Sequence, residues 1–228
     1  MPSDAATARW TFERGSGVAG VVAAALMFTS AALGSTPDEG SATDARLLDF
    51  YNDSTNQARL YVAALVGFAA GLLFLWFLVG LRDRLARVET SGLPSLLHAA
   101  GLVFVILWFL GSIGLALPLA LLYSDFTIEE DDVDALRVTL ILGNHWLPGA
   151  AASTAAVVIG VASFIARRHR LYSRWLAWAG LVVSVPMLAS IAGFLGLTLI
   201  VLMIWSVATG IWLIRSDPSR ATQPLEST

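Results

Sequence analysis

The sequence predicts an all-α protein: a polytopic transmembrane helix bundle of six spans with both termini cytoplasmic. Apolar residues make up 57% of the 228 residues, against about 45–50% in soluble proteins. Charged residues make up only 14%, where about 25% is usual. The apolar residues also gather into runs long enough to cross a bilayer, with the charges at their borders. This composition excludes a disordered chain, a nucleic-acid-binding protein and a small secreted disulfide scaffold.

The six predicted spans follow from bilayer thickness. A hydrocarbon core about 30 Å thick needs roughly 20 apolar residues in a helix. None of the six runs contains Asp, Glu or Arg, and a charge at mid-bilayer would cost at least about 2.5–3.5 kcal/mol. The spans are 18–34, 60–81, 96–123, 138–166, 175–193 and 197–214. They form one transmembrane domain, 18–214, between a cytoplasmic N-terminal segment, 1–17, and a cytoplasmic tail, 215–228.

The last two spans come from a single apolar run, 175–214, which is twice as long as one crossing requires. The tetrapeptide Gly193-Phe194-Leu195-Gly196 lies near its centre, and Gly tolerates the backbone angles of a tight turn. We therefore expect a hairpin at this point, which returns the chain to the side that it left.

The distribution of charge orients the predicted bundle. All 14 basic residues are Arg, and 11 of them fall in the segments 1–17, 82–95, 167–174 and 215–228. Of the 17 acidic residues, 11 fall in the other loops, 35–59 and 124–137. An excess of Arg in short loops marks the cytoplasmic side. The sequence therefore predicts a multi-pass protein of the bacterial cytoplasmic membrane, since the exclusive use of Arg suggests a high-GC bacterial genome.

An alternative concerns the first span. Arg9 and Arg14 precede an apolar stretch that ends in Ser30-Ala31-Ala32, an arrangement that also fits a secretory signal with a small-residue cleavage site. The measured mass of the intact purified protein separates the two alternatives.

Few residues could carry chemistry. The chain has no Cys and no Lys, which removes thiolate sites and lysine Schiff bases. His98 and His145 are predicted on opposite sides of the midplane, so they cannot ligate one haem. No zinc-protease motif or phosphate-binding loop is present. We expect no cofactor, no metal and no catalytic residue, and hence a protein that is not an enzyme.

The segment Asn144-His145-Trp146-Leu147-Pro148 is the most polar part of the predicted spans. Pro148 cannot donate to the carbonyl of Asn144, which leaves that group free. One hypothesis is an outward-facing polar pocket for a small molecule or lipid, lined by Asn144, His145, Trp146 and Ser112. The alternative is hydrogen bonding between helices at a kink. A Ser112–His145 dyad of an intramembrane hydrolase is a further alternative, although Gly111-Ser112-Ile113-Gly114 does not match the rhomboid motif.

The loops suggest two surfaces. In residues 43–61, Leu47, Tyr51, Ala58 and Tyr61 form a helical stripe, so this loop is predicted to be a helical extension. Arginines at the other end could contact anionic lipid headgroups, or simply anchor the bundle; they are Arg167, Arg168, Arg170 and Arg174.

Four segments carry a resemblance to a known group: residues 50–53 (FYND), 74–85 (FLWFLVGLRDRL), 174–181 (RWLAWAGL) and 193–196 (GFLG). In these segments the chain resembles an uncharacterised family of six-span integral membrane proteins from high-GC bacteria. The resemblance covers residues 17–214 and implies the six-span architecture. It assigns no activity and no functional residue.

The leading functional hypothesis is a non-enzymatic membrane scaffold, accessory subunit or sensor-like module. Its expected partners are the lipid bilayer and a membrane protein or a second copy of the chain. The alternative is the small-molecule or lipid carrier with its pocket at Asn144 and His145.

Overall fold

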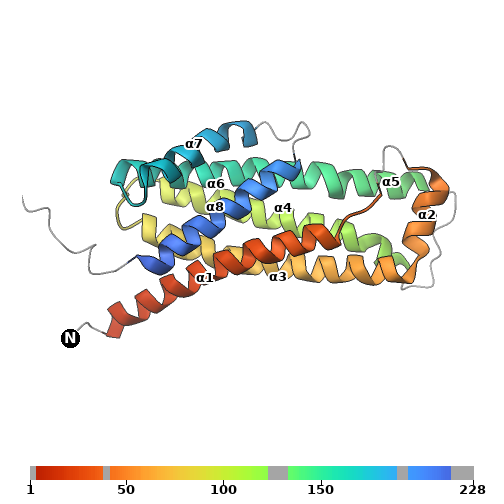
Figure 1. The fold of residues 1–228 in the computed structure, drawn as a ribbon, viewed down its shortest axis with the longest axis horizontal. Coiled ribbons are helices and arrows are strands. Elements are labelled where there is room, and N and C mark those ends of the chain that lie inside the picture. The colour runs from red at the N-terminus through yellow and green to blue at the C-terminus, as the bar shows by residue number, and fades with distance from the viewer. Residues whose placement is uncertain (1–3, 38–41, 123–132, 189–194, 217–228) are drawn as a thin grey trace, which may run out of the picture.

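The computed structural model describes residues 4–37, 42–122, 133–188 and 195–216. At 4–10, 115–122, 144–145 and 195–197 only the course of the backbone is described. The described chain is almost entirely helical and contains no strand. Figure 1 shows the helices side by side along one long axis. In chain order they are α1 (Asp4–Leu33), α2 (Asp44–Asn52), α3 (Ser54–Leu85), α4 (Leu93–Leu122), α5 (Val133–Ile141), the π-helical segment η2 (Leu142–Trp146), α6 (Leu147–His169), α7 (Arg174–Leu188) and α8 (Leu195–Arg215).

Five helices are long and apolar enough to cross a membrane. The stretches are Thr11–Leu33, Ser54–Leu85, Leu93–Gly114, Leu147–His169 and Thr198–Arg215. Their outward faces carry large apolar side chains: Phe28, Leu72 and Ile204 are each at least 60% exposed. Apolar surface of this extent is unfavourable in water and suits contact with lipid. The fold class is therefore that of a membrane-embedded helix bundle.

The predicted number of six spans is not confirmed. The predicted span 175–193 corresponds to α7, which has 15 residues and a length of about 22 Å. That length is shorter than the hydrocarbon core. Residues 189–194, which include most of the predicted hairpin, lie outside the described residues.

Three helix boundaries differ from the sequence prediction. Helix α1 begins at Asp4 rather than near residue 18, and Glu13 and Ser16 are already buried in the bundle. The segment 138–166, predicted as one α-helix, is interrupted by η2. In the loop 43–61, the helix stops at Asn52 and restarts at Ser54 because Asp53 caps α3. Thr127, followed three residues later by Glu130, is a capping-box pattern that predicts a start of the fourth helix near Ile128, and this start lies outside the described residues.

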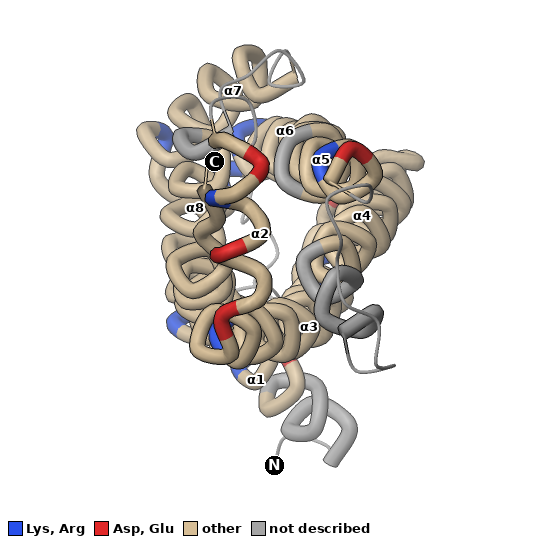
Figure 2. Tube along the Cα trace, turned by 90° about the vertical axis from the view of Figure 1, so that its right-hand side faces the viewer, with Lys and Arg blue, Asp and Glu red and all other residues tan. Residues whose placement is uncertain are grey.

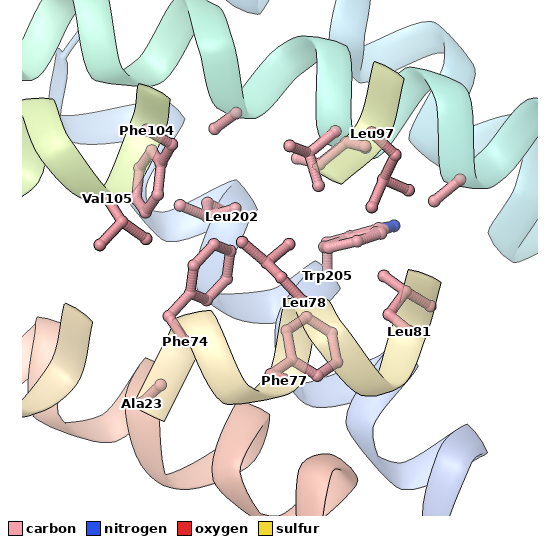
Figure 3. Packing of buried hydrophobic residues seen from close by; sticks show 14 of the residues in the cluster. Ala23, Phe74, Phe77, Leu78, Leu81, Leu97, Phe104, Val105, Leu202 and Trp205 are labelled. Atoms are coloured by element: carbon pink, nitrogen blue, oxygen red, sulfur yellow. The ribbon is translucent and has the colours of Figure 1, made fainter. Parts of the chain in front are cut away.

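The core lies between α3, α4, α6 and α8. Figure 3 shows Phe74 and Leu78 of α3 facing Phe104 of α4, with Leu202 and Trp205 of α8 beside them. The rings of Phe74 and Phe104 have centroids 4.9 Å apart, and those of Phe77 and Trp205 are 6.1 Å apart. These large side chains are almost fully buried, so α3 is the central helix of the bundle.

Small residues set the closest helix approaches. Ala63, Gly67 and Gly71 recur at intervals of four, a spacing that predicts close contacts between helices, and all three are buried in α3. Helices α1 and α8 cross where Gly17 meets Gly210. A Cβ atom at Gly17 would lie 2.7 Å from the carbonyl oxygen of Gly210, and one at Gly210 would lie 2.6 Å from that of Gly17. Only glycine allows the two backbones to approach this closely.

Candidate functional site

The segment that contains Asn144 and His145 is a single π-helical turn. The backbone N–H of Leu147 donates to the carbonyl of Leu142, five residues earlier, instead of the usual four. The physical cause is Pro148, whose missing N–H cannot pair with Asn144. The Trp146 side chain is 59% exposed, while the Asn144 and His145 side chains lie outside the described residues. Single π turns are frequent at functional sites.

Ser112 lies on a different face of α4 from the one that meets this turn. Its hydroxyl donates to the carbonyl of Trp108 at 3.0 Å, and it is buried against Gly67 of α3. The residues of α4 that approach η2 are Gly111 and Gly114, opposite Gly143. The described contacts therefore connect Ser112 with α3.

A polar seam surrounds Ser112. Trp108 donates its indole N–H to the carbonyl of Gly67 at 2.8 Å, and Ser30 of α1 donates to the carbonyl of Ala63 at 2.9 Å. These bonds join α1, α3 and α4 through α3 backbone carbonyls. Hydrogen bonds between helices of this kind stabilise a bundle within a membrane.

The four arginines predicted at the lipid surface have different environments. Arg168 pairs with Glu89 at 3.2 Å, and the Arg167 guanidinium lies 4.1 Å from the centre of the Trp178 ring. Arg170 ends α6 in the left-handed conformation (φ 54°), and Arg174 begins α7. The latter two are exposed and make no ion pair within the described part of the chain. We call this end of the bundle, where α3 and α6 end and α7 begins, the arginine-rich end.

Two buried carboxylates hold the arginine-rich end together, and neither is predicted from the sequence. Glu13 of α1 is 4% exposed and pairs with Arg84, at 3.5 Å, and with Arg87. Glu89, in the α3–α4 loop, is 5% exposed and contacts Arg168 and His169 of α6. Each carboxylate joins elements far apart in the sequence. In the sequence, the only indication of these ion pairs is that each glutamate lies in a segment rich in arginine.

The environment of Glu89 favours its charged form. A hydrogen bond to His169, hydrogen bonds from Ser91 and the nearby charge of Arg168 lower the pKa of Glu89 from 4.5 to about 2. Glu89 is therefore ionised throughout the physiological range.

A second contact fastens the loop between α6 and α7 to α8. The indole N–H of Trp212 donates to the carbonyl of Leu171 at 2.9 Å, and the Tyr172 ring packs edge-on against Trp212 at 5.4 Å. The Tyr172 hydroxyl is buried close to Ser163, and this burial raises its pKa. These contacts with Trp212 hold the loop between α6 and α7 against α8.

The opposite end of the bundle carries a small folded platform. Helix α2 lies across the end of the long helices (Figure 1). Its Leu47 and Tyr51 are buried against residues of α3 and α5, in two clusters that are separate from the main core. Figure 2 looks onto this end and shows acidic residues along α2 and on α5. We call α2 and α5 the acidic platform.

Arginines fix the platform to the bundle. Arg137 of α5 donates to the carbonyl of Ala42 and pairs with Asp44, both at 2.7 Å. Arg59 of α3 donates to the carbonyl of Ser35 at 2.7 Å and lies over the Phe50 ring. Of the stripe predicted for this loop, Leu47 and Tyr51 are buried but Ala58 and Tyr61 are exposed. The break at Asp53 changes the helix direction, so a single stripe cannot continue.

Within the described residues, no three His, Asp or Glu side chains lie close enough together to hold a metal ion. Comparisons with protein-family models, with curated proteins and with solved structures found no match to this chain. The family resemblance therefore stays a prediction, and any functional argument depends on the geometry above.

Proposed function

We propose that this protein is a non-enzymatic module of a bacterial cytoplasmic membrane: a scaffold, accessory subunit or sensor-like component with six spans and both termini cytoplasmic. The acidic platform is the observation that carries the proposal. A chain that only had to cross the membrane would need no separate hydrophobic clusters that hold a helix across the ends of its spans. Here Leu47 and Tyr51 hold α2 in a fixed position, so that its opposite face stays available.

The exposed face of the platform favours a basic partner. Asp49 is exposed and has no partner among the described residues, and the side chain of Asp44 is 67% exposed although it pairs with Arg137. Because exposed charges act mainly on encounter and specificity, a positively charged loop of a membrane protein is the expected partner. A second copy of the chain is the other candidate.

Purification in a mild detergent after cross-linking in cells tests this proposal. We expect a stoichiometric partner with the unmodified chain and clearly less of it with Asp49→Arg. Asp83→Arg is a control, because Asp83 is a partly exposed carboxylate at the arginine-rich end. A clean monomer from cross-linked cells, or equal recovery with both variants, would contradict the proposal.

The π turn supports a second candidate, a carrier or binder of a small molecule or lipid at Asn144 and His145. A bound molecule should copurify with the unmodified chain, be detected by mass spectrometry, and be lost with Asn144→Ala but not with Asn52→Ala. Equal recovery from both variants would contradict it. The intramembrane hydrolase has less support, because the described contacts of Ser112 are with Trp108 and Gly67.

A further inference from the structure

A groove opens between α7 and α8, over α6. Its cavity has a volume of about 240 Å³, and all the residues that line it are apolar. They include Ile159 of α6, Leu176, Gly180 and Val183 of α7, and Val201 and Trp205 of α8. The groove is therefore an apolar recess on the lipid-facing surface of the bundle.

The packing of the two flanking helices explains why the groove is open. Helix α7 packs on α6, where Gly180 lies directly over Ser163. Helix α8 packs on α1 at the Gly17–Gly210 crossing and contacts α7 only slightly. Figure 1 shows α8 running diagonally away from α7. An apolar recess offers water no polar partners, so hydrocarbon is the natural occupant.

Exposed arginines lie on both walls at one end of the groove. Helices α7 and α8 are antiparallel, so Arg174 at the start of α7 and Arg215 at the end of α8 lie at the same end of the bundle. Arg170 lies in the adjoining loop, which Trp212 holds against α8. Arg167 and Arg168 already have partners, but Arg170 and Arg174 have no ion-pair partner within the described residues.

We propose that this groove binds one acyl chain of an anionic phospholipid, with the lipid phosphate held by Arg170 and Arg174. Guanidinium groups bind phosphate oxygens through paired, charge-assisted hydrogen bonds. The headgroup of a zwitterionic lipid carries a cation of its own, which would lie beside Arg170 and Arg174 and be repelled by them. A transmembrane helix is about 10 Å across and does not fit a recess of this volume. The proposal adds a ligand site to the function proposed above and does not depend on the acidic platform.

Native mass spectrometry of the full chain after delipidation tests the site. Phosphatidylglycerol and phosphatidylcholine with the same acyl chains are added in turn. We expect phosphatidylglycerol to bind more tightly to the unmodified chain. The double variant Arg170→Gln/Arg174→Gln should lose roughly tenfold to thirtyfold of this preference.

Matched variants separate the contribution of the headgroup to binding from that of the acyl chain. Ala179→Phe places a ring in the groove and should weaken both lipids, whereas Val185→Phe, on the exposed face of α7, should weaken neither. Arg46→Gln removes a charge from the acidic platform and should leave the preference intact. Millimolar glycerol phosphate should not compete, because it has no acyl chain.

Three results would overturn the proposal: equal binding of the two lipids, an equal effect of Arg46→Gln and the double variant, or competition by glycerol phosphate alone. The first two would mean that these arginines select no lipid. The third would mean that they form a site for a soluble phosphate compound. If Ala179→Phe fails to fold, the arginine variants still decide the outcome, because both side chains are exposed.

Discussion

Glu89 shows how a single buried carboxylate engages neighbouring cationic side chains. A count of arginines at one end of the bundle suggests several cations for lipid headgroups. Glu89 pairs with Arg168, and Glu13 pairs with Arg84 and Arg87. Because both carboxylates are buried, these pairs connect the ends of the helices. Of the four arginines predicted at the lipid surface, Arg170 and Arg174 have neither an ion pair nor a stacked ring within the described residues, which leaves them available for lipid.

The Glu89 contacts predict a dependence of stability on pH. The pKa of Glu89 is lowered from 4.5 to about 2, so its contribution to stability is fully present above pH 4.5. That contribution is lost as the pH falls toward 2. We expect Glu89→Gln to have a lower thermal midpoint than the unmodified chain at pH 7. The difference between the two midpoints should shrink between pH 4.5 and 2.

Asp83→Asn is the control, because Asp83 pairs with Arg82 in a position where both side chains are more than 40% exposed. Exposed pairs contribute little to stability, so this variant should behave as the unmodified chain at every pH. A difference between Glu89→Gln and the unmodified chain that stays constant down to pH 2 would contradict the account of Glu89.

At the scale of the helices, the Gly17–Gly210 crossing fixes α8 against α1. A Cβ atom at Gly17 would meet the backbone of α8, which cannot move aside as a side chain can. We therefore expect Gly17→Ala to reduce the stability by about 1–3 kcal/mol, the usual cost of overpacking a close contact. Thermal unfolding in detergent measures this cost.

Gly92→Ala is the matched control, because a Cβ atom at Gly92 would have no atom within 4 Å. This variant should leave the midpoint nearly unchanged. An equal effect of the two substitutions would mean that the crossing is not a specific backbone contact.

The element scale also shows what the sequence can predict. Hydropathy located the apolar cores of α1, α3, α4, α6 and α8, because a bilayer requires long uncharged runs. The four-residue spacing of small residues also predicted close helix contacts at Ala63, Gly67 and Gly71. Hydropathy could not locate the start of α1 at Asp4, since the helix continues before the apolar run, where Glu13 is buried against Arg84 of α3.

Two local features were not predicted, for different reasons. The cap at Asp53 could have been predicted, because Asp-Ser-Thr is a favoured helix start. The π turn at Leu142–Trp146 could be predicted only in part, because Pro148 indicates a disturbed helix but not the form of the disturbance. The groove between α7 and α8 depends on how three helices pack, and no spacing in the sequence encodes it.

At the scale of the whole molecule, the two ends of the bundle differ in charge and in packing. The acidic end carries a folded platform with its own small clusters, whereas the arginine-rich end has ion pairs made by two buried carboxylates. The proposed function requires the platform to face the outside and both termini to face the cytoplasm. The number of crossings, including that of α7, decides whether this arrangement is correct.

Labelling of single cysteines in cells tests this arrangement most directly, because the chain has no native Cys. We expect a membrane-impermeant maleimide to label Asp49→Cys on α2 in cells with an intact inner membrane. Thr90→Cys, in the α3–α4 loop, and Ser216→Cys, after α8, should react only once that membrane is permeabilised. Labelling of Ser216→Cys from the outside, or protection of Asp49→Cys, would contradict six spans with cytoplasmic termini.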